Sequence, residues 1–169
     1  MGRFSFFSPK NIRFCVFLRE EKTRHKEKKL YFCGEMTHYP IKILMAFACT
    51  FEPEQGDEFS DWLMRNGYPE LVALSQTIQG DTKAKDWLME HKFPQLAAID
   101  SVIDKEAKAE EWLIRNHFDV NLAFAKAINR DDDATDWLEK NELQIFIVIA
   151  DKIRNYLDDK YLNFHKIHF

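Results

Sequence analysis

The tryptophans of this chain recur at one fixed interval. They lie 25 residues apart and each is followed by a leucine: Trp62, Trp87, Trp112 and Trp137. A constant period of this length is typical of a chain that repeats one supersecondary unit in tandem. The period therefore predicts a repeat architecture before any single residue is given a role.

Within each unit the apolar residues follow helical spacing. A large apolar residue stands six and twelve residues after each tryptophan, and an isoleucine stands sixteen after it. Pro69 and Pro94 suit the first turn of a helix, where the missing N–H costs little, and Asp119 takes the same place as an expected N-cap. Each unit is therefore predicted to hold two short helices. The second begins near the proline, and the first ends at Gly67, Lys92 or His117.

We expect an all-α fold, an α-solenoid-like right-handed stack of short helical hairpins with a 25-residue repeat. Helices of about ten residues are unstable alone in water, so they must be held by packing on their neighbours. A small N-terminal arm is expected at residues 1–36 and the helical repeat domain at 37–169. The domain is divided into a lead-in helix at 39–51, repeats at 62–86, 87–111 and 112–136, and a modified C-terminal repeat at 137–169, with a last helix at 143–157.

Residues 39–162 resemble the broad class of α-solenoids, to which ankyrin, tetratricopeptide and HEAT repeats belong. The resemblance rests on the periodicity of helix pairs alone. A 25-residue unit is shorter than the periods of those families, and their sequence signatures are missing. No single family is identified, and no functional residue is carried over from one.

The arm at residues 1–36 lies outside the repeat pattern. The apolar runs 3–7 and 12–18, around Ser8-Pro9-Lys10-Asn11, favour a β-hairpin weakly, whereas the charge run 20–29 is typical of a solvated or disordered segment. A β-hairpin and a disordered arm both stay open, as does a natural start at Met36.

Charge is divided unevenly along the chain. Residues 1–36 hold nine Lys/Arg against four Asp/Glu, whereas the remainder holds fifteen against twenty-four. An acidic repeat region argues against nucleic acid as a partner and favours a protein with a basic surface. No stretch is long and apolar enough to predict a membrane span. Three cysteines without metal-ligand spacing favour a reducing compartment, so we expect a cytoplasmic protein.

The sequence holds no pattern of a catalytic, cofactor or metal site. A glycine-rich phosphate loop, a nucleophile elbow and a metalloprotease helix are all missing. We therefore expect neither an enzyme nor a cofactor. One alternative keeps an enzyme or ligand-binding site between the arm and the repeats, near Cys33, Glu35 and His38.

The first functional hypothesis is a non-enzymatic protein–protein interaction module or scaffold. The residues that vary at the ends of the tryptophan helices form the expected surface for an unidentified protein partner: Met64, Arg65, Met89, Glu90, Ile114, Arg115, Glu139 and Lys140. The tryptophans themselves are interpreted as core residues packed between successive tryptophan-bearing helices, because they do not vary from unit to unit.

One apolar run breaks the pattern near the C-terminus. Residues Ile145, Phe146, Ile147, Val148 and Ile149 would cover every face of a helix. A terminal repeat normally presents a polar outer face, so this run needs a cover. The preferred cover is intramolecular, either the N-terminal arm or the tail at 161–169. The alternatives are a partner protein and a second copy of the chain, which would make a self-assembling structural unit or homodimer.

Overall fold

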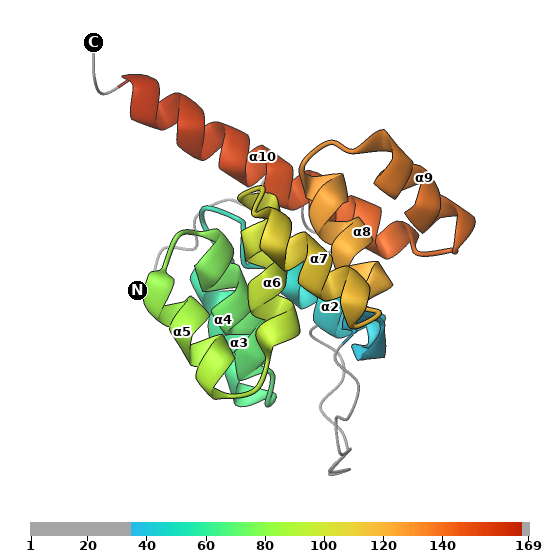
Figure 1. The fold of residues 1–169 in the computed structure, drawn as a ribbon. Coiled ribbons are helices and arrows are strands. Elements are labelled where there is room, and N and C mark those ends of the chain that lie inside the picture. Colours follow the sequence, from blue (N-terminus) through green and yellow to red (C-terminus); the bar gives the residue numbers. More distant parts are fainter. Residues whose placement is uncertain (1–34, 167–169) are drawn as a thin grey trace, which may run out of the picture. The chain divides into compact units, whose positions relative to one another are not determined.

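The computed structural model describes residues 35–166, with side chains described as far as Leu162. In this range every regular element is helical, which confirms the all-α expectation (Figure 1). The elements are the 3₁₀ helix η1 (Met36–His38) and the α-helices α2 (Ile41–Cys49), α3 (Gly56–Arg65), α4 (Pro69–Ile78), α5 (Thr82–Glu90), α6 (Pro94–Ile103), α7 (Ala107–Arg115), α8 (Asp119–Ile128), α9 (Asp132–Lys140) and α10 (Gln144–Lys166). The expected hairpin or disordered arm falls almost wholly outside the described residues.

The helices keep the 25-residue period of the sequence. α4, α6 and α8 begin at residues 69, 94 and 119, and α5, α7 and α9 begin at 82, 107 and 132. We call α2, α4, α6, α8 and α10 the inner helices and α3, α5, α7 and α9, which carry the tryptophans, the outer helices. One local prediction was wrong. Asp119 is the first helical residue rather than a side-chain cap.

Both kinds of turn contain one residue in the left-handed conformation at the same place in each unit. After the outer helices these residues are Gly67, Lys92, His117 and Glu142. After the inner helices they are Gly80, Lys105 and Arg130. Their φ values lie between 59° and 100°. Only two of the seven are glycines, the residue that adopts this conformation without steric cost. The geometry of the repeat therefore fixes the turn even where the residue type does not favour it.

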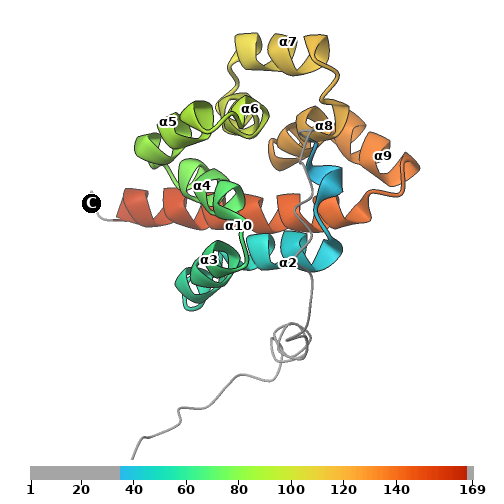
Figure 2. The same cartoon turned by 90° about the horizontal axis from the view of Figure 1, so that it is seen from below.

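Neighbouring inner helices contact each other along the chain, and each outer helix packs on the inner helices before and after it. Among the described residues, no Cα of one outer helix lies within 8 Å of a Cα of another. Figure 2 shows the outer helices set apart from one another around the inner ones. The outer helices are thus held by the inner layer and not by each other.

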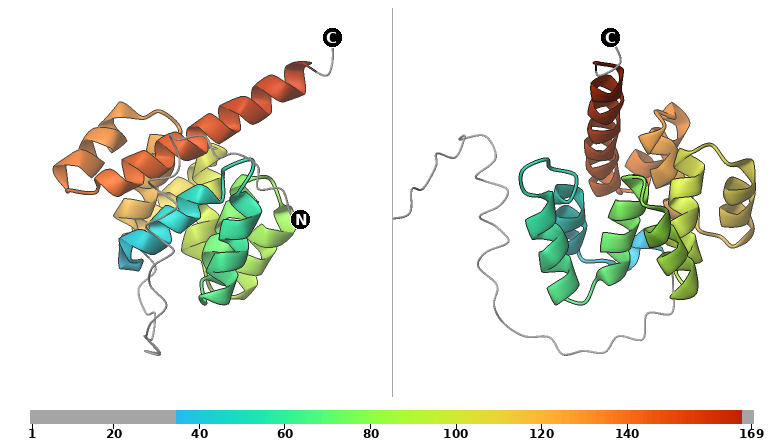
Figure 3. Two further views of the ribbon diagram at one scale, coloured as in Figure 1. Left: turned by 180° about the vertical axis from the view of Figure 1, so that it is seen from behind. Right: turned by 90° about the vertical axis from the view of Figure 1, so that its left-hand side faces the viewer.

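The last helix packs against the first long one. α10 contacts α8 and α9 and also α2, so the contacts of the inner helices run from α2 through α4, α6, α8 and α10 back to α2. Figures 2 and 3 show α10 lying beside α2, with its last turns extending past the other helices. The rings of Phe51 and Tyr156 meet edge to face with centroids 5.6 Å apart, and Lys152 pairs with Glu52.

Leucines, not tryptophans, fill the space beneath the outer helices. The leucine that follows each tryptophan is fully buried: Leu63, Leu88, Leu113 and Leu138. The tryptophans are half-buried, and Trp137 is 37% exposed. The interpretation of the tryptophans as core between successive outer helices was therefore wrong. The backbones of those helices are not in contact, and the leucine beside each tryptophan is buried in the core instead.

Candidate binding surfaces

The eight residues predicted as a partner surface all lie on exposed positions of the outer helices. Met64, Met89 and Ile114 occupy the same place in successive units and are 54%, 57% and 52% exposed. In the fourth unit this place is taken by Glu139, which is also exposed. Three of the four outer helices therefore present a large apolar side chain to solvent at one repeated position.

A groove between α3 and α5 brings one of these apolar side chains next to a tryptophan. Its volume is about 470 Å³, with Met64 on one wall, Trp87 on the other, and Val72 and Ala73 of α4 among its lining residues. On an α-helix, positions two apart point to nearly opposite sides. At this groove Met64 of α3 therefore faces the following outer helix, and Trp87 of α5 faces the preceding one.

Two of the four tryptophan rings stack on residues of their own unit. The Trp87 ring stacks on His91 with centroids 3.9 Å apart, and the Trp112 ring stacks on Phe118 at 5.6 Å. A side chain four residues after each tryptophan donates to the tryptophan carbonyl oxygen: Asn66, His91, Asn116 and Asn141, at 2.7 to 2.9 Å. The same carbonyl also accepts the backbone N–H of that residue, at 3.0 to 3.2 Å, so the side chain adds a second bond at the helix end.

The apolar run in α10 is covered by the chain itself. Phe146 and Ile149 are 1% and 0% exposed, whereas Val148 is 52% exposed, and Ile145 and Ile147 are half-buried. The rings of Phe146 and Phe124 of α8 meet edge to face at 5.6 Å. An intramolecular cover was expected, and among the described residues α8 provides part of it. The N-terminal arm and the side chains of most of the tail at 161–169, which the sequence suggested, lie outside the described range. Val148 is therefore the one residue of this run whose side chain is exposed enough to contact a second copy of the chain.

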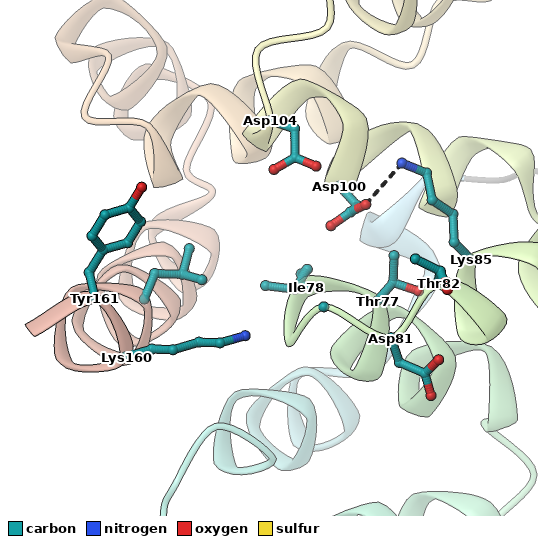
Figure 4. A pocket seen from close by; sticks show the side chains of 11 residues that line it. Thr77, Ile78, Asp81, Thr82, Lys85, Asp100, Asp104, Lys160 and Tyr161 are labelled. Atoms are coloured by element: carbon teal, nitrogen blue, oxygen red, sulfur yellow. Dashed lines mark ion pairs between the residues drawn. The ribbon is translucent and has the colours of Figure 1, made fainter. Parts of the chain in front are cut away.

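A second cavity lies where α4, α6 and α10 meet, and sequence reasoning missed it. Its volume is about 690 Å³ (Figure 4). Ile78 and Leu157 form apolar walls, and Tyr161 and Lys160 of α10 face Asp100 and Asp104 of α6 across the opening. Nothing in the local sequence marks this place, because its walls come from segments up to 84 residues apart (161 less 77).

The acidic wall of this cavity contains one half-buried ion pair. Lys85 Nζ lies 3.1 Å from Asp100 Oδ2, and burial raises the pKa of the Asp100 carboxyl from its usual value against the opposing effect of Lys85. Asp104 is exposed at the end of α6. The remaining charged residues of the lining are Asp81, at the start of α5, and Lys160. The lining thus carries three carboxylates and two ammonium groups.

The residues of the alternative enzyme site do not form a catalytic cluster within the described range. Cys33 lies outside it. His38 Nδ1 bonds to the backbone oxygen of Glu35 at 3.0 Å on an exposed surface. In the part of the chain that the structure describes, no three His, Cys, Asp or Glu side chains are grouped as metal ligands would be. Cys49, whose thiol is not in a disulfide, is buried in α2.

No protein-family model, no curated protein and no solved structure matches this chain. None of the helices between residues 35 and 166 has both the length and the apolar character needed to cross a membrane. A functional assignment must therefore come from the surfaces themselves.

Proposed function

We propose that this chain is a non-enzymatic protein-interaction module, a cytoplasmic scaffold made of tandem helical repeats in an α-solenoid-like right-handed stack. The observation that supports the proposal most is the repeated exposure of Met64, Met89 and Ile114 on three outer helices. Single exposed apolar residues are ordinary on protein surfaces, but a repeated series beside half-buried tryptophans makes a patterned apolar surface.

The groove between α3 and α5 adds a concave site to this exposed apolar surface. Grooves between helices accept an amphipathic helix or an apolar segment of a partner. Asp61 lies on its α3 wall, and residues 37–169 are acidic overall, with fifteen Lys/Arg against twenty-four Asp/Glu. A partner segment with apolar anchors and flanking basic residues fits this combination best.

Site-specific photo-crosslinking in extracts of the cells that make the protein tests the proposal. A benzophenone amino acid at position 89 should give discrete adducts that excess unlabelled protein suppresses. The same group at position 107, exposed at the start of α7, serves as the control. Adducts that are absent at position 89, or that are the same at both positions, would overturn the proposed surface.

A pair of charge-matched variants separates binding from folding. Met89→Glu/Ile114→Glu copies the residue that α9 carries naturally at Glu139, so the fold should be kept while the adducts are lost. Ala107→Glu/Gln144→Glu adds the same charge at first helical positions, where acids are favourable, and should keep the adducts.

Self-assembly through α10 is the second candidate, favoured only by the exposure of Val148. Val148→Asp should then convert a dimer into a monomer in light scattering. A wild-type protein that is monomeric at high concentration would exclude this candidate and leave the outer-helix surface unaffected.

A further inference from the structure

The inner helices end in a repeated hydrogen-bonding device. A side chain 26 to 29 residues further along the chain, at the end of the next inner helix or within it, donates to carbonyl oxygens at the end of the previous inner helix. Gln79 donates to Thr50 O after α2 at 3.3 Å, and Asn129 donates to Val102 O and Ile103 O of α6 at 2.9 and 3.1 Å. Such bonds satisfy carbonyls that a helix end leaves without partners.

Arginine performs the same task at the junction of α8 and α10. Arg154 Nη2 donates to Ala127 O at 2.7 Å, and its Nε donates to Ile128 O at 3.4 Å. One guanidinium thus spans the last two carbonyls of an inner helix. Its planar array of donors suits two acceptors held in fixed positions.

The junction between α4 and α6 lacks such a donor. The residue at the corresponding place is Asp104, whose ionised carboxylate can only accept. The equivalent carbonyls are those of Thr77 and Ile78 at the end of α4. Among the described residues, no side chain donates to either, and Thr77 O accepts only backbone N–H groups, those of Gln79 and of Gly80, the latter at 2.8 Å.

The 690 Å³ cavity lies at this junction. Thr77, Ile78 and Asp104 are all among its lining residues (Figure 4). Lys160 reaches over from α10 but donates to Gln79 O at 2.5 Å, one residue beyond the two carbonyls. The place that Asn129 and Arg154 fill at the two following junctions is therefore left as open space between a carboxylate and the negative end of a helix.

We propose that this cavity binds the alkylguanidinium group of a ligand, which supplies the donors that Asp104 cannot. The guanidinium lies between the Asp104 carboxylate and the carbonyls of Thr77 and Ile78, and its alkyl stem packs on Ile78 and Leu157. Two sources carry this chemistry, a free small molecule and an arginine side chain of another chain. The cavity lies at the ends of the inner helices, so the proposal does not depend on the outer-helix surface.

Isothermal titration with two probes tests the proposal and distinguishes the sources. Agmatine represents a free alkylguanidinium, and acetyl-Gly-Arg-Gly-amide represents an arginine in a chain. Binding of agmatine alone indicates a small molecule, binding of the peptide alone indicates a partner, and binding of both supports the shared chemistry. The peptide with citrulline in place of arginine lacks the charge and should bind about tenfold more weakly or worse. If neither probe binds at millimolar concentration, the proposal is wrong.

Substitutions at Asp104 provide the second test. Asp104→Asn and Asp104→Arg copy Asn129 and Arg154, so each should supply the missing donor from within the chain. Both variants should unfold at no lower urea concentration than the wild type and bind the probe about tenfold more weakly or not at all. Asp132→Asn, on the exposed start of α9, is the matched control and should leave binding unchanged. Unaltered binding in a folded Asp104→Arg protein would place the probe elsewhere and overturn the assignment.

Discussion

The backbone N–H of Phe93 donates to the carbonyl oxygen of Leu88 over 2.8 Å, and the same bond closes every outer helix. Tyr68, Phe118 and Leu143 donate in the same way to the leucine five residues earlier, at 2.9 to 3.0 Å. This six-to-one bond, with a left-handed residue just before its donor, is the Schellman ending of a helix. In a Schellman ending the side chains of the two bonded residues usually contact each other. This explains why a leucine and a large apolar residue recur together, five residues apart.

The left-handed residues within these endings predict a gain in stability from glycine. An L-residue with a side chain pays roughly 1–2 kcal/mol in this conformation, part of which glycine loses again through its greater freedom when unfolded. Lys92→Gly and Lys105→Gly should each raise the free energy of unfolding by about 0.5–1 kcal/mol. Urea denaturation measures it. Glu111→Gly, at an exposed position in the middle of α7, should instead lower stability by about 1 kcal/mol.

The burial of the leucines beside the tryptophans predicts which of the two holds the fold. Leu113 is 0% exposed, so Leu113→Ala should cost about 2–5 kcal/mol because it leaves a cavity in a packed layer. Trp112 is half-buried against Phe118, and Trp112→Ala should cost only about 1–2 kcal/mol. The two midpoints in urea decide the order. If Trp112→Ala lowered the free energy of unfolding more than Leu113→Ala, the tryptophans would have to be counted as core residues.

Local regularities of the sequence predicted the helices well, and long-range contacts account for what was missed. Pro69 and Pro94 mark first turns, and Gly67 marks a helix end, because each residue type acts on its own backbone. The packing of α2 on α10 joins Glu52 to Lys152, which are 100 residues apart, and no local pattern announces such a contact.

The cavity left a signal in the sequence that was not recognised. One repeated position, at 25-residue intervals, holds Gln79, Asp104, Asn129 and Arg154. Asp104 is the only acid among them, and the other three side chains can donate hydrogen bonds. The spacing alone does not say that these side chains meet the carbonyls of the previous inner helix. The structure supplies that meaning, since the partner atoms come from a different unit.

The side chain that caps α5 predicts a tolerant substitution. His91 bonds to Trp87 O at 2.9 Å, where the other three outer helices use asparagine. His91→Asn should keep this bond and leave the free energy of unfolding within about 0.5 kcal/mol of the wild type. His91→Ala should lower it by about 1 kcal/mol. Thermal unfolding of both variants makes the comparison. A loss from His91→Asn as large as that from His91→Ala would assign the role to ring stacking on Trp87.

The buried carboxyl of Glu70 predicts a pH-dependent stability. Burial raises the pKa of Glu70 above its usual 4.5, against hydrogen bonds from its own backbone and from the Tyr39 hydroxyl at 3.1 Å. The native state therefore holds this proton more tightly than the unfolded chain, and stability falls as pH rises from 4.5 through the raised pKa. The cost is complete above that pKa and relieved below pH 4.5. Glu70→Gln should thus be more stable relative to the wild type at pH 7 than at pH 4 in urea denaturation. The exposed Glu90→Gln controls for loss of charge alone.

The device at the ends of the inner helices predicts the effect of breaking it where it is intact. Asn129 makes two bonds to the end of α6, so Asn129→Ala should lower the free energy of unfolding by about 1–2 kcal/mol. Asn129→Asp keeps the size of the side chain but sets a carboxylate against two carbonyl oxygens and the negative end of a helix. It should therefore cost more than Asn129→Ala, although it is nearly isosteric. Urea denaturation ranks the two variants. If Asn129→Asp were the more stable of the pair, a carboxylate at this place would not repel the helix end, and the special character assigned to Asp104 would lose its physical basis.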